Sequence, residues 1–136
     1  MSMHDLRTNI LVSNALDYTN ITATGNTDGE ILDMQGYKSA TFALRAGTIT
    51  DGVYTPSLLE GSATGSMSAV STAEVIGVSS ANTIGSADDN GVVTLGYVGS
   101  KRYVQLRVAA TGVSTGGNVL ANAILGYAQD NPVTEG

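Results

Sequence analysis

The stretch Lys101–Ala110 (KRYVQLRVAA) constrains the fold more than any other part of this 136-residue chain. Its even positions, including Val104, Leu106 and Val108, are apolar, whereas most of the intervening positions are polar or amphipathic. A period of two residues is typical of a β-strand with one buried face. The stretch therefore predicts a core strand whose other face is free to contact solvent or a partner.

The rest of the chain is also typical of strands joined by turns. Patterns of β-branched and apolar residues predict further strands at Thr8–Ser13, Ile21–Thr24, Glu30–Met34, Ser39–Ala46, Val53–Glu60, Val92–Tyr97 and Asn118–Ala128. We therefore expect an all-β, single-domain antiparallel β-sandwich, jelly-roll or immunoglobulin-like, with eight or nine short strands and little helix. The predicted organisation is an N-terminal arm over residues 1–7, the sandwich over 8–129 and a C-terminal tail over 130–136.

Local chemistry suggests how these strands connect. Residues Asn14–Asn20 are interpreted as a connection, and Gly25–Gly29 (GNTDG) as a turn because glycine, asparagine and aspartate favour turn geometry. Asp51-Gly52 predicts a hairpin between its flanking strands. Thr72–Gly77 is compatible with either one helical turn or a short strand, and the low-complexity segment Gly61–Thr72 is expected to be the longest loop.

Two single residues carry structural expectations of their own. Phe42 is the only phenylalanine, so we expect it at the centre of the core. Pro56 has no backbone N–H to donate, which places its strand at a sheet edge or a bulge.

Composition excludes several functional classes. The formal net charge of -6 disfavours nucleic-acid binding, which needs clustered positive charge. No segment approaches the roughly 20 apolar residues that span a bilayer, so no membrane partner is expected. The absence of cysteine excludes disulfides and zinc–thiolate sites.

Catalytic and metal-binding patterns are weak. The single histidine, His4, falls in the predicted arm, and the adjacent Asp88 and Asp89 would point to opposite faces of a strand. A calcium loop starting at Thr24 would place Gln35 where an acid is required. No glycine-rich segment is followed by the lysine of a phosphate-binding loop. We expect no enzyme activity, no catalytic residues, no cofactor and no metal.

The basic residues of the stretch Lys101–Ala110 leave two interpretations open. Lys101, Arg102 and Arg107 are three of the six basic residues in the chain. They form either a solvated basic patch or a set of partners for acids on another subunit. Similarly, Tyr97, Tyr103 and Tyr127 either cap sheet edges or form a platform for a sugar or a protein partner.

Two segments of the chain resemble a known family. Leu32–Ser62 (LDMQGYKSATFALRAGTITDGVYTPSLLEGS) and Asp88–Gly117 (DDNGVVTLGYVGSKRYVQLRVAATGVSTGG) are similar to small virion proteins of tailed bacteriophages. The similarity covers about half of the chain and includes the Asp51-Gly52 pair and the Gly96–Arg107 strand. Members of that family lie among head genes and include capsid cement, or decoration, proteins.

The resemblance implies a noncatalytic virion protein, made in the host bacterial cytoplasm and bound to the outer surface of the capsid, where it bridges subunits of the major capsid protein. Neighbouring copies of the chain, as a dimer or trimer, are the second expected partner. The candidate capsid or subunit contacts are Lys101, Arg102, Tyr103, Arg107, Arg45, Met1, Ser2, Met3 and His4.

Two alternative functions remain. A tail or head–tail connector component would form rings of its own, and a carbohydrate-binding module would lose glycan binding in a Tyr103→Ala variant. For the cement protein we expect Arg107→Glu to weaken capsid attachment with the fold intact, and Leu106→Ala to cost about 2 to 5 kcal/mol of stability.

Overall fold

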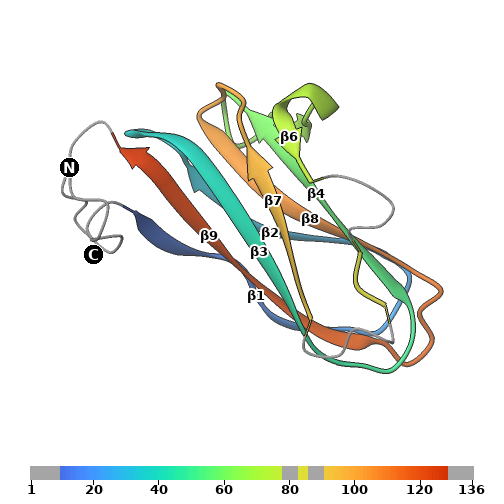
Figure 1. Ribbon diagram of the computed structural model, residues 1–136. Helices are drawn as coiled ribbons and strands as arrows, with labels where there is room; N and C mark the ends of the chain where they lie inside the picture. Colours follow the sequence, from blue (N-terminus) through green and yellow to red (C-terminus); the bar gives the residue numbers. More distant parts are fainter. Residues whose placement is uncertain (1–9, 78–82, 86–90, 129–136) are drawn as a thin grey trace.

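The computed structural model describes residues 10–77, 83–85 and 91–128, which form two antiparallel sheets packed face to face (Figure 1). The five-stranded sheet has the order β1 (Leu11–Ile21), β9 (Gly117–Ala128), β3 (Tyr37–Ile49), β7 (Val92–Tyr97) and β6 (Val75–Ile76). The four-stranded sheet has the order β2 (Gly25–Asp33), β8 (Tyr103–Thr111), β4 (Val53–Gly61) and β5 (Ser68–Ala69). This architecture confirms the predicted single-domain β-sandwich.

The core lies between the sheets and contains the predicted face of β8. Val104, Leu106 and Val108 are at most 1% exposed, and Phe42 and Leu44 of β3 in the opposite sheet are each 1% exposed. Phe42 therefore occupies the central position expected for it. The inner face of β9 completes this layer with Val119, Ala121, Ala123 and Leu125.

Nearly all consecutive long strands lie in different sheets. The chain crosses from one sheet to the other between β1 and β2, β2 and β3, β3 and β4, β7 and β8, and β8 and β9. The hairpin predicted at Asp51-Gly52 is therefore wrong, although a turn is present and Gly52 has the positive φ of 93° that favours glycine. Turn chemistry depends on the local backbone, whereas the sheet that a strand joins depends on distant partners.

The N-terminal third of the sandwich also differs from the prediction. Residues 14–20 belong to β1 because they pair with β9, with register shifts that bury both Ala15 and Leu16. The predicted turn Gly25–Gly29 lies inside β2, and the predicted strand Ile21–Thr24 contains the actual turn between β1 and β2.

Gly29 explains why the segment Gly25–Gly29 has the composition of a turn although it lies within a strand. A Cβ atom at Gly29 would overlap the backbone carbonyl oxygen of Ala15 in β1. Glycine is needed here because the two strands approach closely. The same residue type thus signals either a turn or a close contact, and only the pairing of the strands distinguishes them.

Several smaller expectations can be compared with the structure. The nitrogen of Pro56 faces the side of β4 away from β8, where Tyr54 bonds Ile84, so the missing N–H breaks no bond to β8, as expected. Thr72–Gly77 contains both alternatives, a 3₁₀ turn η2 (Thr72–Glu74) followed by β6, but the side chain that caps the turn belongs to Ser71. The strands are longer than predicted, since β1, β3 and β9 have 11, 13 and 12 residues.

Some predictions fall outside the described residues. These are the arm over 1–7 with Met1, Ser2, Met3 and His4, the tail over 130–136, and the adjacent acids Asp88 and Asp89. Within the part of the chain that the structure describes, no helix is long and apolar enough to cross a membrane.

Candidate protein-contact surfaces

The outer face of the four-stranded sheet contains an ion pair between β8 and β2. Arg107 lies opposite Asp28 in the strand register. Its Nε donates to Oδ1 of Asp28 at 2.6 Å and its Nη2 donates to Oδ2 at 3.1 Å. This two-pronged hydrogen bond from Arg107 lowers the pKa of the Asp28 carboxyl.

A second pair of the same kind lies at the end of these strands. Arg102 donates from Nε and Nη2 to the two carboxylate oxygens of Asp33 at 2.9 and 2.8 Å. The hydrogen bond from Arg102 is also the main cause of the lowered pKa of Asp33. The Arg102 guanidinium lies 5.1 Å from the centre of the Tyr103 ring, within cation–π range.

Gln105 adds a polar contact between the two ion pairs. Its side-chain amide donates to the backbone carbonyl of Gly29 at 2.7 Å, at the irregularity where β2 shifts register between Asp28 and Ile31. The outward side chains of Gln105 and Arg107, together with that of Arg102 beside β8, are thus used within the same chain. Arg102 and Arg107 are therefore not a free basic patch, and their contact with another subunit stays a prediction.

The outer face of the five-stranded sheet has a different character. The strand registers place Arg45 of β3 between Leu120 of β9 and Val92 of β7. We call this surface the Arg45 face and define it by the outward positions Val12, Asn14, Thr41, Ala43, Arg45, Ile76, Val92, Thr94, Gly96, Leu120, Asn122 and Ile124. Arg45 is the one charged residue among these twelve positions. Asp17 and the exposed Tyr18 lie beside them on the edge strand β1, in the register shift opposite Leu120, and the Asp17 carboxylate accepts a hydrogen bond from the Asn14 side chain.

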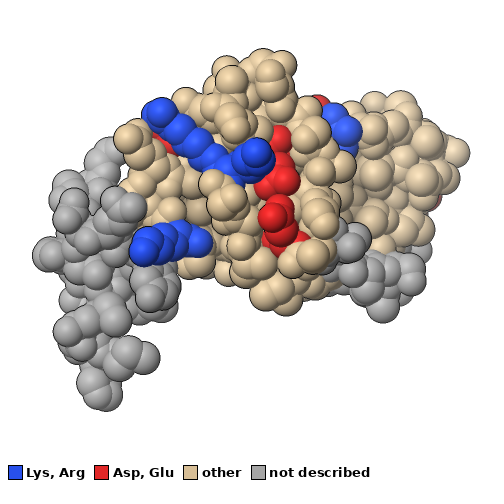
Figure 2. Space-filling model, turned by 90° about the horizontal axis from the view of Figure 1, so that it is seen from above, with Lys and Arg blue, Asp and Glu red and all other residues tan. Residues whose placement is uncertain are grey.

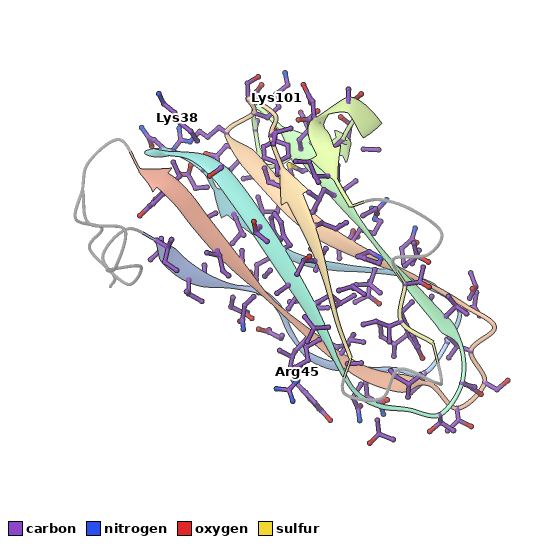
Figure 3. All side chains as sticks on the ribbon, viewed as in Figure 1. Lys38, Arg45 and Lys101 are labelled. Carbon is purple, nitrogen blue, oxygen red and sulfur yellow. The ribbon has the colours of Figure 1, made fainter. Side chains whose placement is uncertain are left out.

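Three of the seven exposed large hydrophobic side chains in the described part of the chain lie on this face. Val12, Ile76 and Val92 are 50%, 64% and 57% exposed. The structure shows no ion pair between Arg45 and any described residue, and its side chain points away from the sandwich (Figure 3). A sheet surface with little charge and exposed aliphatic groups is typical of the centre of a protein interface.

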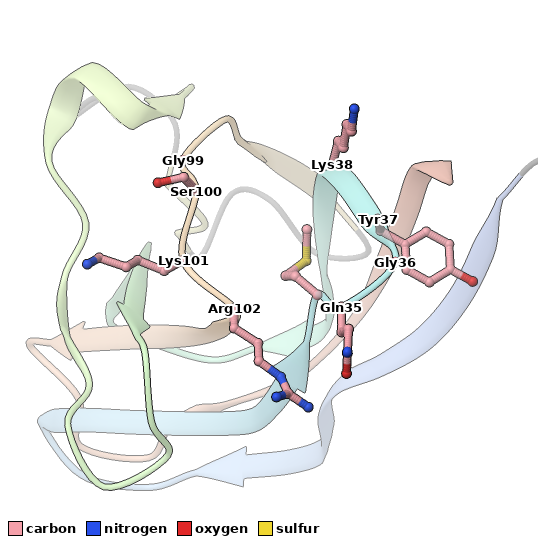
Figure 4. Close-up of a pocket in the computed structure, with 9 residues that line it drawn as sticks. Gln35, Gly36, Tyr37, Lys38, Gly99, Ser100, Lys101 and Arg102 are labelled. Carbon is pink, nitrogen blue, oxygen red and sulfur yellow. The ribbon is translucent and has the colours of Figure 1, made fainter. Parts of the chain in front are cut away.

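One end of the sandwich carries a hollow of about 570 Å³ between the β2–β3 and β7–β8 connections. Lys38, Lys101 and Arg102 contribute to its wall. In the close-up the side chains of Lys38 and Lys101 point away from each other (Figure 4). Viewed from above, basic side chains lie on both sides of a small group of acidic ones (Figure 2). The charges do not converge on one point as a small-anion site requires.

Buried Tyr97 fixes the position of Lys101 at this end. The Tyr97 hydroxyl donates to Oε1 of Glu60 at 2.7 Å and accepts from the Lys101 backbone N–H at 3.0 Å. Burial, and then the Glu60 hydrogen bond, raise the pKa of Tyr97. Tyr97 is 1% exposed, so it cannot contribute to a surface platform of tyrosines.

The other end of the sandwich is held by Asp51. Its carboxylate accepts the backbone N–H groups of Ser114, Thr115 and Gly116, the shortest at 2.8 Å from Gly116. These hydrogen bonds, that from Thr115 first, lower the pKa of Asp51. They join the β3–β4 and β8–β9 connections across the two sheets, which gives Asp51 a structural role.

The structure therefore separates the candidate contact residues. Arg102, Tyr103 and Arg107 lie on or beside β8, Lys101 lies at one end, and Arg45 lies on the opposite sheet. Sequence reasoning missed the extended neutral surface around Arg45, because its residues come from five strands with no common local pattern. Among the described residues, no group of three histidine or acidic side chains is placed to hold a metal ion.

Comparison with known proteins gives structural likeness only. No protein-family model and no curated protein sequence matches the chain. The chain is similar to the crystal structure of the SPBc2 prophage-derived protein YomS, with a TM-score of 0.51 and 16% identity over 86% of this chain and 92% of that chain. At this identity the likeness shows a shared sandwich fold.

Two other solved structures have lower scores. The C-terminal domain of the sugar-binding protein EclA has a TM-score of 0.41, with 12% identity over 91% of this chain and 82% of that chain. The N-terminal cellulose-binding domain of a Cellulomonas fimi β-1,4-glucanase gives 0.39, with 14% identity over 87% and 86%. Neither value supports an argument about function.

Proposed function

We propose that this chain is a structural protein of a tailed phage, and specifically a cement protein that binds the outer surface of the capsid. In this role it bridges subunits of the major capsid protein and catalyses no reaction. The observation that carries the proposal is the Arg45 face, an exposed sheet surface whose twelve defining positions contain no acidic residue in a chain of net charge -6, with Asp17 at its edge on β1.

Two further observations support a phage origin. The segments 32–62 and 88–117 resemble small virion proteins of tailed phages. A prophage-derived protein, YomS, shares the fold over most of both chains.

The physical demands on a cement protein agree with this surface. Such a protein covers a repeated array of capsid subunits, so it needs a broad, regular surface with few charges to desolvate. A sheet presents such a surface because its outward side chains stand in rows fixed by the strand register. The proposal includes contacts between neighbouring copies, as a dimer or trimer on the particle.

The test uses purified expanded capsids that lack this protein. Added wild-type chain is expected to sediment with the capsids and to raise the temperature at which they break open. Val92→Asp, on the Arg45 face, is expected to reduce both effects, whereas Val53→Asp is the matched control because Val53 is 43% exposed on the other sheet. Absence of both binding and heat resistance with the wild-type chain would contradict the proposal.

The same preparation separates a tail or connector component from a cement protein. A connector is expected to form closed rings by itself, which mass measurement in solution would detect. A cement protein is expected to remain a small oligomer or a monomer until capsids are added.

A further inference from the structure

We propose that the Arg45 face binds a protein surface that is largely uncharged and presents a carboxylate to Arg45. This inference rests on the proposed function, in which that surface belongs to the major capsid protein. It goes further by naming the face that docks, the residue at its centre and the chemistry of the group that it meets.

The first step is the state of the arginines in the free chain. Arg102 and Arg107 each bond a carboxylate of their own chain through two nitrogens. Arg45 has no ion pair with a described residue, and its neighbours across the strands are Leu120 and Val92. Of these three arginines, only Arg45 can therefore bond a partner's carboxylate without first breaking an ion pair within its own chain.

The second step concerns what can cover this residue. A partner that buried Arg45 without an opposite charge would leave an unpaired guanidinium out of water, which costs several kcal/mol. A carboxylate in the partner removes that cost and can accept two parallel N–H bonds, as Asp28 and Asp33 already do on the other sheet. Charge complementarity thus favours a partner with an acidic group opposite Arg45. The aliphatic neighbours of Arg45 favour apolar residues around that acidic group.

The third step is the size of the face. Five strands at a spacing of about 4.8 Å give a width of about 20 Å, and rows about 6.8 Å apart give a similar length with side chains included. The resulting area of about 400 Å² is roughly half of what each partner contributes to a standard interface. One such contact is weak, so attachment depends on many copies or further contacts, and whole capsids are the appropriate probe.

The experiment compares two charge reversals that change the net charge equally. Arg45→Glu alters the proposed face, and Lys38→Glu alters an exposed lysine outside it, at one end of the sandwich. We expect Arg45→Glu to weaken binding to expanded capsids about tenfold or more and Lys38→Glu to change it less than about twofold. Thermal unfolding of both variants checks that they remain folded, and Arg45 has no ion pair with a described residue whose loss would destabilise the chain.

A second measurement tests for the carboxylate itself. The Arg45→Lys variant keeps the charge and introduces an amine, which a carbodiimide couples to an adjacent carboxylate. We expect a cross-link between position 45 and an acidic residue of the major capsid protein, identified by mass spectrometry.

The outcomes separate this inference from the proposed function. If wild-type chain binds capsids and Arg45→Glu binds equally well, the inference is overturned and the cement function stands. If the cross-link from position 45 joins two copies of this chain, the face is a homo-oligomer contact and the inference is also overturned. If wild-type chain does not bind capsids, the proposed function fails first and this inference fails with it.

Discussion

The two outer faces of the sandwich are built by the same alternation but have opposite chemistry. On the four-stranded sheet the register sets Arg107 opposite Asp28, and Arg102 is held by Asp33. On the five-stranded sheet the register sets Arg45 between two aliphatic residues. Whether a basic side chain is available to a partner therefore depends on which acidic residues the fold places beside it, and the basic residue alone does not reveal this.

The largest expected effect lies beneath both faces, in the core that they share. Leu106→Ala removes a side chain that is 1% exposed, and we expect it to lower the free energy of unfolding by about 2 to 5 kcal/mol. Gln105→Ala, one residue away on the outer face, is expected to cost about 1 kcal/mol through the lost bond to Gly29. Equal losses in denaturant titrations would show that β8 is buried on both sides.

Arg107→Glu tests the internal use of the four-stranded face. It places two carboxylates opposite each other, so we expect it to lower the free energy of unfolding by about 1 kcal/mol, since the pair is partly exposed. This revises the expectation that the fold is unaffected. The expected loss of capsid attachment in Arg107→Glu stays a prediction, and binding to the same capsids measures it.

A double variant that exchanges the charges of Asp28 and Arg107 is the matched control for Arg107→Glu. Asp28→Arg combined with Arg107→Asp restores opposite charges across the strands, and we expect it to recover most of the lost stability. A swap that stays as unstable as Arg107→Glu would show that the lost energy comes from packing and that the ion pair contributes little.

Acid is expected to weaken the two ion pairs on the four-stranded sheet, whereas the twelve positions of the Arg45 face contain no carboxylate to protonate. The Arg107 and Arg102 hydrogen bonds lower the pKa values of Asp28 and Asp33 below the unfolded value of about 3.9. Each carboxylate therefore contributes stability that is present above about pH 4 and is lost as the pH falls through its folded pKa. Denaturant midpoints between pH 5 and pH 2 should fall less steeply in Asp28→Asn than in wild type.

The acid response of Asp28→Asn should not vanish. Asp33 remains, and Asp51 has a pKa lowered by the backbone N–H of Thr115 and its neighbours, so both continue to titrate. An unchanged slope in Asp28→Asn would mean that the Asp28–Arg107 pair does not contribute to stability in solution.

The smallest expected effect is on the Arg45 face. Arg45→Ala removes no described ion pair, so we expect the free energy of unfolding to change by less than about 0.5 kcal/mol, with the same pH dependence as wild type. A loss comparable to that of Arg107→Glu would show that Arg45 has a structural partner, and the contrast between the two faces would then fail.

The sequence by itself determined the class of fold, the central place of Phe42 and the inward face of β8, because alternation and burial are properties of single strands. It also located the turn at Asp51-Gly52, since glycine is needed where φ is positive. It did not determine that this turn crosses between sheets, or that Gly29 marks a close approach between two strands.

The tertiary structure decided which charged residues meet. Asp28 and Arg107 are 79 residues apart, and their pairing follows from the register of β2 and β8. The same applies to the Arg45 face, whose rows combine strands from both ends of the chain. Register arises from long-range pairing and core packing, so no local pattern in the sequence reveals which outward side chains remain free for a partner.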